Sequence, residues 1–174
     1  ERYGSHAINE SIATHLRRHR GLQVGEETTE LLKTTFASTF LPEDISKSMS
    51  VRGRDVTTGG PGAVEVTAGE IYPIVEGIVR RIALRVKDTL TELRPEVAAD
   101  IYDRGVIITG GGALLEGIDQ YLRSFINLPV TISDEPRYAT VNGLVKMFDD
   151  EKLLERVSRN ELNVLQNAEI PFEV

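Results

Sequence analysis

The sequence predicts an α/β fold, and three observations carry that prediction. A short apolar run at 106–108 consists of β-branched residues, residues 114–125 have helical spacing, and a second short apolar run follows at 130–132. Strand, helix and strand at this spacing form a βαβ unit, with parallel strands and a right-handed connection. We therefore predict part of a parallel sheet, in which residues 106–108 are apolar and buried on both faces.

The turn between the first strand and the helix contains three consecutive glycines, Gly110-Gly111-Gly112. Because glycine has no Cβ atom, a ligand can lie against the bare backbone, where the N–H groups of a helix start point toward it. Leu114, Leu115, Ile118 and Leu122 follow on one helical face. Ligands of parallel sheets bind beyond the carboxyl ends of the strands, which is where this turn falls. The turn is a candidate ligand site, and a sharp turn without a ligand is the alternative.

Two amphipathic helices and a hairpin precede this unit. Apolar residues recur every four positions over 5–20, where the helix stops at Gly21, and a second helix is predicted after Gly25. Residues 45–56 and 63–67 alternate in polarity around a glycine-rich turn, which predicts a β-hairpin. The residues expected to face inward are Ile8, Ile12 and Leu16 on the first helix and Leu31, Leu32 and Phe36 on the second.

A long helix is predicted to start at Thr67. Thr67-Ala68-Gly69-Glu70 has the capping-box pattern, and the strongest apolar periodicity of the chain follows it. Pro73 lies past the first turn, so we expect a kink or a late start there. Pro95 begins another short helix that leads to the strand at 106–108.

The last part of the chain is predicted to contain two more helices. One covers 138–148, and the acidic run 149–151 can cap the next at its N-terminus. The pattern is weak from Asn160 onward, and Pro171 precludes a helical ending. The predicted parts are an α/β portion at 1–21 and 67–148, an inserted small subdomain at 22–66, and a C-terminal helix and tail at 149–174.

Composition limits the classes of function. The 174 residues are 40% hydrophobic, which suffices for one domain or two small ones. A net charge of −7 argues against a nucleic-acid binder that acts through bulk electrostatics, and the absence of cysteine excludes thiol chemistry. No apolar run approaches roughly 18 residues and no signal-peptide pattern occurs, so we expect a soluble chain. Since it starts at Glu1, we expect a piece of something longer.

A dinucleotide-binding turn is one alternative for the glycines. Asp134, at the end of the next strand, has the position expected of a ribose-binding carboxylate. The G-x-G-x-x-G pattern that starts at Gly110 fails, however, because Leu115 stands where the last glycine is required. Only one βαβ unit is visible as well.

Two further pairs have simple interpretations. His15 and His19 lie four residues apart and could share a metal, but no third ligand is placed beside them, so surface histidines are favoured. Glu30 and Lys33 are most simply an i, i+3 surface ion pair.

Four collinear blocks resemble the bacterial actin homologue MreB, with a match from about Ile8 to about Met147. The blocks are Val51-Arg52-Gly53-Arg54-Asp55, the run 95–105, the run 107–115, and Asp134-Glu135-Pro136. The resemblance implies an actin-like (ribonuclease H-like) α/β fold, of which this chain has only the second half: a large-subdomain portion with an inserted helix-and-hairpin subdomain. It also implies an actin-like ATPase family that polymerises into filaments under the membrane and directs rod shape.

The resemblance also assigns a nucleotide site. The residues that match the adenosine motif are Gly110, Gly111, Gly112 and Ala113, and those that match the nucleoside-contacting helix positions are Glu30 and Lys33. The implied cofactor is ATP, with Mg²⁺ held mainly by the missing half. The implied partners are other copies in a filament or the missing half of the fold. Nucleic acid is not expected, and the implied location is cytoplasmic, with membrane contact only indirect, through the rest of the assembly.

The chain departs from the family at one run. Where the family has a G-G-D-x-F-D type run, this chain reads Gly4-Ser5-His6-Ala7-Ile8-Asn9, without either acidic residue. The phosphate-binding hairpins of the family lie upstream of such a run, so we do not expect this chain to hydrolyse ATP by itself. Two alternatives stay open: a non-catalytic interaction module of actin-like fold that has lost nucleotide binding, and a small dinucleotide-binding domain.

Overall fold

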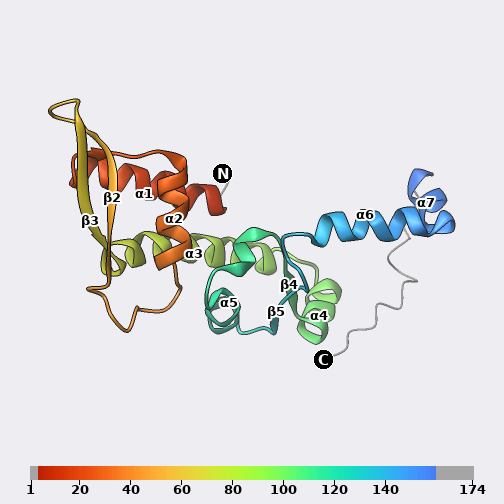
Figure 1. The fold of residues 1–174 in the computed structure, drawn as a ribbon. Helices are drawn as coiled ribbons and strands as arrows, with labels where there is room; N and C mark the ends of the chain where they lie inside the picture. The colour runs from red at the N-terminus through yellow and green to blue at the C-terminus, as the bar shows by residue number, and fades with distance from the viewer. Residues whose placement is uncertain (1–3, 160–174) are drawn as a thin grey trace. The chain divides into compact units, whose positions relative to one another are not determined.

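The computed structural model describes residues 4–159, which form the larger part of two compact units, Glu1–Pro136 and Arg137–Val174. Figure 1 shows the elements, whose bounds are α1 Ser5–His19, β1 Leu22–Gln23, α2 Glu26–Phe36, β2 Ser48–Asp55, β3 Pro61–Thr67, α3 Ala68–Thr91, α4 Pro95–Arg104, β4 Val106–Ile108, the 3₁₀ turn η1 Gly111–Leu114, α5 Ile118–Ile126, β5 Val130–Ile132, α6 Ala139–Asp149 and α7 Glu151–Ser158. The division of the chain into an α/β portion, an inserted subdomain and a tail stays a prediction.

The core of the first unit forms where α1, α2 and α3 pack against one another. The sequence predicts α1 and α2 correctly, because their apolar residues repeat at helical spacing. The large apolar side chains that these helices bury are Ile8, Ile12, Leu16, Leu32, Phe36, Ile71, Val75, Ile78 and Val79. Fully burying one such side chain stabilises the fold by about 2 kcal/mol, so this helical core dominates the packing.

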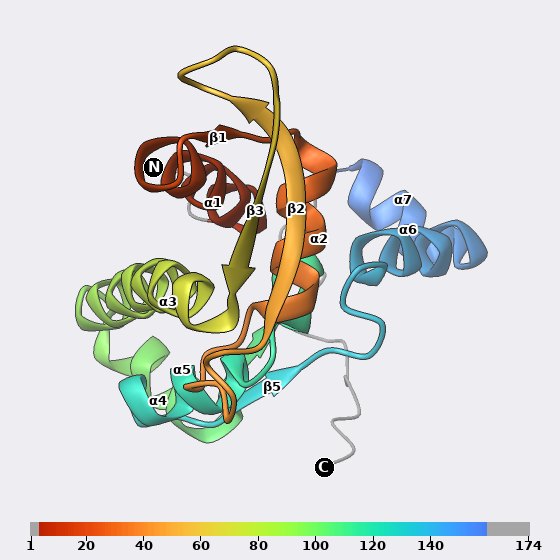
Figure 2. The ribbon, with the colours of Figure 1, turned by 60° about the vertical axis from the view of Figure 1, so that its left-hand side comes forward.

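A three-stranded antiparallel sheet, in the order β1-β2-β3, continues this core. The predicted hairpin is confirmed as β2 and β3, and Figure 2 shows its connecting loop beyond the ends of α1 and α2. Val51 pairs with Val64 and Met49 with Val66, so all four side chains share one face, on which Val51 and Val66 are buried. The strand β1 was not predicted, because two residues are too few to show an alternating pattern, although Leu22 is buried.

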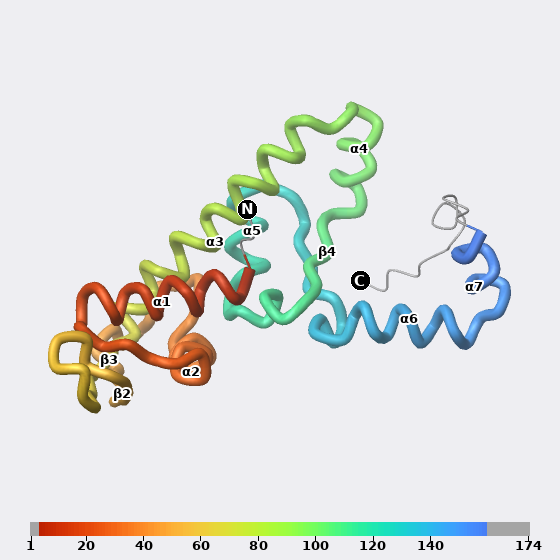
Figure 3. The backbone as a smooth tube through the Cα atoms, turned by 90° about the horizontal axis from the view of Figure 1, so that it is seen from above, coloured from red at the N-terminus to blue at the C-terminus, as the bar shows by residue number. Residues whose placement is uncertain are grey.

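The long helix α3 begins where the capping box predicts. Glu70 N–H donates to Thr67 Oγ1 at 3.2 Å, and Thr67 N–H donates to Glu70 Oε2 at 3.0 Å. The helix starts at Ala68 and continues through Pro73, so the expected late start at the proline is wrong. The cap satisfies backbone N–H groups of the first turn, and this stabilises the helix start ahead of Pro73. Figure 3 shows α3 running from the end of the hairpin to α4.

The predicted βαβ unit is confirmed, since β4 and β5 are parallel neighbours on either side of α5 in the sequence. The predicted helix over 114–125 starts too early. The chain first forms η1 and then turns at Gly117, whose φ of +74° is left-handed, and α5 begins only at Ile118. A left-handed residue interrupts a right-handed helix, and glycine adopts that conformation without steric cost.

Three apolar residues predicted to face inward are exposed. Leu31 on α2 is 50% exposed and Leu114 at the end of η1 is 56% exposed. Ile107, predicted to be buried because both faces of a parallel sheet are normally covered, is 48% exposed, and its sheet has only the strands β4 and β5 among the described residues. One face of this small sheet is therefore not covered within residues 4–159.

The second unit contains α6 and α7, both close to their predicted positions. Asp150 caps α7 by accepting a hydrogen bond from Leu153 N–H at 3.0 Å, as the acidic run predicts. The weak pattern from Asn160 and the ending at Pro171 lie outside the described residues. Of the helices in residues 4–159, none has both the length and the apolar character needed to span a bilayer.

The cap of α3 generates a prediction. Thr67→Ala removes the hydroxyl that accepts from Glu70 N–H, so the free energy of unfolding should fall by about 1 kcal/mol. Thr67→Ser keeps an acceptor at the same place, so its free energy of unfolding should fall much less. Urea unfolding of the three proteins measures the difference. If the free energy of unfolding fell equally in the alanine and serine variants, the hydroxyl would not be what stabilises the helix start.

Candidate functional site

The glycine turn is held in place by its own backbone. Gly110 has φ of +83°, a conformation that L side chains rarely adopt. Its N–H donates to Pro136 O at 2.7 Å, and its carbonyl accepts from Ala113 N–H at 3.1 Å. The next residues form η1, whose first N–H groups have no carbonyl partner within a 3₁₀ turn. The turn therefore presents backbone donors next to the end of β4.

Gly112 differs from Gly110 in its backbone conformation. Its φ is not left-handed, and a Cβ atom built on it would meet no atom within 4 Å. The fold of the described residues therefore has room for a side chain at Gly112. This open space leaves the backbone at Gly112 accessible to a ligand.

A cavity of about 290 Å³ lies beside Gly112. It joins the turn to the start of α1, because Gly4 and Ser5 line it together with Gly112 and Ala113. The other residues around it are mostly apolar and come from α1, α3, β4 and α5. A concave, largely apolar space with a few polar groups is the usual form of a small-molecule site.

The two predicted residues of α2 connect to the same cavity through Ser5. Lys33 Nζ donates to Ser5 Oγ at 2.6 Å and to Glu30 Oε2 at 2.5 Å, and Asn9 Nδ2 donates to the same Glu30 oxygen at 2.8 Å. The Lys33 side chain is only 11% exposed, whereas Glu30 is 44% exposed. The i, i+3 ion pair is confirmed, but its lysine is a mostly buried group at the edge of the cavity.

Four of the six predicted site residues fall into two pairs that Ser5 links, and the other two lie outside the cavity lining. Gly112 and Ala113 line the cavity directly, and Lys33 and Glu30 reach it through Ser5. Gly110 and Gly111 shape the turn and are not among the lining residues.

Ser5 and Asn9 also belong to the site, although no sequence pattern predicts them as site residues. Asn9 is buried, and its Oδ1 atom has no hydrogen-bond partner among the described residues. Both belong to the run at which the chain departs from the family pattern, and that departure was the signal that could have identified them.

The histidine pair does not form a metal site in the described residues. The rings of His15 and His19 lie 5.0 Å apart, and His15 Nε2 is 3.6 Å from Glu70. Within residues 4–159, no group of three or more His, Cys, Asp or Glu side chains is arranged to hold a metal ion. Arg20, the residue after α1, donates to Glu70 Oε1 and to Glu65 O, so it connects the end of α1 to α3 and to β3 of the hairpin.

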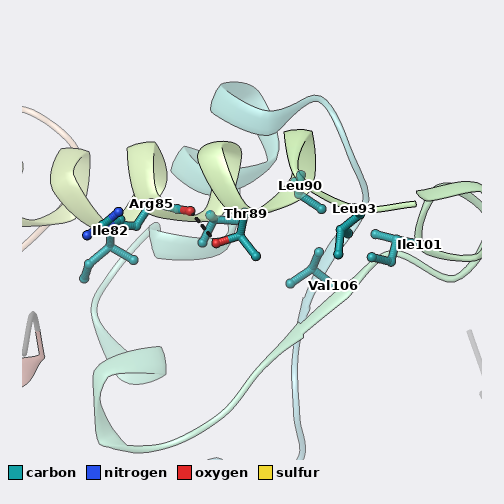
Figure 4. A pocket seen from close by; sticks show the side chains of 8 residues that line it. Ile82, Arg85, Thr89, Leu90, Leu93, Ile101 and Val106 are labelled. Carbon is teal, nitrogen blue, oxygen red and sulfur yellow. Dashed lines mark hydrogen bonds between the residues drawn. The ribbon is translucent and has the colours of Figure 1, made fainter. Parts of the chain in front are cut away.

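A second concave region lies between α3, α4 and β4. Its volume is about 520 Å³ and its lining is mostly apolar. Figure 4 shows Leu90, near the end of α3, and Leu93, just after it, on the side of Ile101 and Val106, while Thr89 Oγ1 donates to Arg85 O at 2.9 Å. None of the six predicted site residues lines this groove.

Comparison with known proteins decides the family. The model of the family described as MreB/Mbl protein matches residues 2–156. The chain belongs to the MreB/Mbl family. Cell shape-determining protein Mbl of Bacillus subtilis (strain 168) is 38% identical over 146 residues, which are 83% of this chain and 44% of that protein. Cell shape-determining protein MreB of Haemophilus influenzae is 34% identical over 143 residues, 82% of this chain and 41% of that protein.

Solved structures confirm the predicted actin-like α/β fold. The crystal structure of MreB5 of Spiroplasma citri bound to ADP has a TM-score of 0.75 and 26% identity, and the match covers 88% of this chain and 45% of MreB5. The MamK double helical filament, at 22% identity and a TM-score of 0.61, shares the fold. The chain spans less than half of the length of the curated MreB/Mbl relatives given above. Because the fold is actin-like, the dinucleotide-binding alternative does not apply.

The buried lysine generates a second prediction. A double-mutant cycle with Glu30→Gln and Lys33→Met should give a coupling energy of about 1 kcal/mol, because Lys33 is mostly buried while exposure of Glu30 screens part of the attraction. The i, i+4 pair Glu155 and Arg159, whose side chains are 59% and 65% exposed, is the control and should couple by about 0.4 kcal/mol. Urea unfolding of each set of variants measures both energies. If the coupling energy of Glu30 and Lys33 were no larger than that of the control pair, burial of Lys33 would not strengthen its ion pair.

Proposed function

We propose that this chain is the nucleotide-binding portion of an MreB-like, filament-forming cytoskeletal protein that takes part in determining cell shape, and that its nucleotide is ATP. Membership of the MreB/Mbl family supports the cytoskeletal role, since the relatives are cell shape-determining proteins. The observation that carries the nucleotide site is the open space at Gly112, beside a cavity that the α1 start and the glycine turn share. The family relationship also favours a cytoplasmic location.

The residues of this site suit a nucleoside. The mostly apolar lining can accept the flat face of a base, and the backbone N–H groups of η1 can donate to its polar atoms. Lys33 supplies donors and Glu30 an acceptor at the Ser5 side, where a ribose could be held. The structure of MreB5, a family relative, was determined with ADP. Bound ATP would supply a cleavable phosphoanhydride, and its Mg²⁺ would be held mainly by the part of the fold outside this chain.

A second candidate function is an interaction module of the same fold that has lost nucleotide binding. The observation that favours it is the run Gly4 to Asn9, where His6 and Asn9 stand in place of the acidic residues of the family pattern. Asn9 donates to Glu30, a contact that a carboxylate could not make. The binding measurement below separates the two functions.

Self-association, or contact with a chain that carries the rest of the fold, is the proposed partnership. Parallel sheets are normally covered on both faces and contain more than two strands. The face of β4 and β5 that carries Ile107 is open among the described residues, and an apolar groove lies beside Val106. Exposed apolar surface of this kind marks interaction sites. A head-to-tail contact between copies would extend into a filament.

Nucleotide binding has a direct test. Gly112→Val should leave the chain folded, because its Cβ points into open space, but should weaken ADP binding at least tenfold by occupying the space of the ligand. Gly77→Val on α3, where a Cβ also meets nothing within 4 Å, is the matched control and should bind as the original protein does. Calorimetric titration with ADP, alongside circular dichroism, measures both effects. Unchanged affinity in a folded Gly112→Val protein would overturn the site, and absence of binding by the original protein would favour the interaction module.

Association is the fourth prediction. At low micromolar concentration the chain should sediment as an assembly larger than one copy, because the open face of β4 and β5 drives contact. Ile107→Lys places a charge on that face and should shift the protein toward the monomer. Val56→Lys changes a residue with the same 48% exposure on the hairpin and should have no effect. A folded monomer at these concentrations, with no binding of a dye for apolar surface, would contradict the proposed contact.

A further inference from the structure

The loop after α2 is tied to the turn after η1 by two hydrogen bonds to one carbonyl. Thr39 N–H donates to Glu116 O at 3.0 Å, and Thr39 Oγ1 donates to the same oxygen at 2.9 Å. Ser38 and Glu116 also form an isolated parallel bridge. Thr39 and Ser38 are buried, with exposed fractions of 4% and 9%. We call this contact of Ser38 and Thr39 with Glu116 the Thr39–Glu116 clamp.

Gly117 makes the close approach of the clamp possible. Its φ is +74°, and a Cβ atom on it would lie 2.2 Å from Phe40 Cε2 and 2.5 Å from Thr39 Oγ1. Both distances are far inside van der Waals contact, so any other residue would push the loop away. The glycine therefore serves the contact between two segments that are 77 residues apart in the sequence.

The clamp connects the two segments that carry the six predicted site residues, α2 and the glycine turn. We call these segments the two walls of the proposed site; the turn lines the cavity, and α2 reaches it through the contact of Lys33 with Ser5. Thr39 follows α2, the helix that carries Glu30 and Lys33, and Glu116 lies two residues beyond the end of η1. On the η1 side, Leu115 precedes Glu116 in the chain and donates its N–H to Gly112 O at 3.1 Å, so one peptide bond and one hydrogen bond connect the clamp to the glycine beside the cavity. On the α2 side, the Lys33 contact with Ser5 is a separate connection to the cavity edge.

We propose that Thr39 is a positioning residue for the nucleotide: its hydroxyl fixes the distance between α2 and the glycine turn, so that both walls meet the nucleoside together. This inference rests on the proposed nucleotide function. A ligand that contacts two walls loses affinity when the walls move independently, because binding must then order them. Thr39 touches no part of the proposed cavity, so its effect on binding acts through the clamp.

The test compares ADP affinity in Thr39 variants of this chain by calorimetric titration. Thr39→Val keeps the shape and removes the hydroxyl bond, which should weaken ADP binding roughly three- to tenfold, the effect of one hydrogen bond. Thr39→Ser restores the hydroxyl and should bind within about twofold of the original protein. Thr39→Ala is measured beside Thr39→Val, since a smaller side chain cannot clash. Thr89→Val removes a hydroxyl bond of the same 2.9 Å length on α3, away from the walls, and should leave the affinity unchanged.

The outcomes are distinguishable. If the original protein does not bind ADP, the proposed nucleotide function fails and the inference fails with it. If the original protein binds and the folded Thr39→Val and Thr39→Ala proteins bind equally well, only the positioning role is overturned, even where their unfolding free energy is reduced. Loss of affinity in these two variants, with recovery in Thr39→Ser and no change in Thr89→Val, supports the role.

Discussion

The burial of one face of α3 is the constraint on which the first unit depends. This helix contacts α1, α2, β3 and α5, so elements from both ends of the unit share its apolar stripe. Ile71, Val75 and Val79 have no exposed surface, and Ile78 has almost none. Because deletion of such side chains costs about 2–5 kcal/mol each, the hairpin, the helices and the βαβ unit are held by the same set of contacts. The cap at Thr67 fixes where that helix starts, and so fixes the position of each apolar residue on it.

Unlike α3, whose apolar stripe is buried, the small parallel sheet of β4 and β5 has apolar surface that the described residues leave exposed. Hydrogen bonds join β4 only to β5 among the described residues, and Ile107 is half exposed. The relatives are more than twice as long as the matched region, so the surface that covers this sheet in them can come from the remainder of their chains. The exposed face of β4 and β5 is also the reason for the proposed partnership, because the described residues do not bury this apolar surface.

The candidate site depends on contacts between segments that are distant in the sequence. Lys33 binds Ser5, and Thr39 binds Glu116, so α2 is connected both to the start of α1 and to the end of the glycine turn. An ion pair that is merely i, i+3 on an isolated helix has little effect on stability. The same pair beside Ser5 and Asn9 becomes part of a partly buried polar network, in which each group restricts the position of the next.

The sequence by itself determined the local structure and the family. Periodicity located α1 to α3, the capping box located the start of α3, and β-branched runs located β4 and β5, because these signals act within one turn or one strand. The blocks around Arg52 and the glycine turn identified the fold. Only the tertiary structure decided which apolar residues are buried, where α5 begins, and that Ser5, Asn9 and Thr39 join the site. Exposure of Ile107 and the left-handed turn at Gly117 depend on neighbours far along the chain, and no local pattern encodes such neighbours.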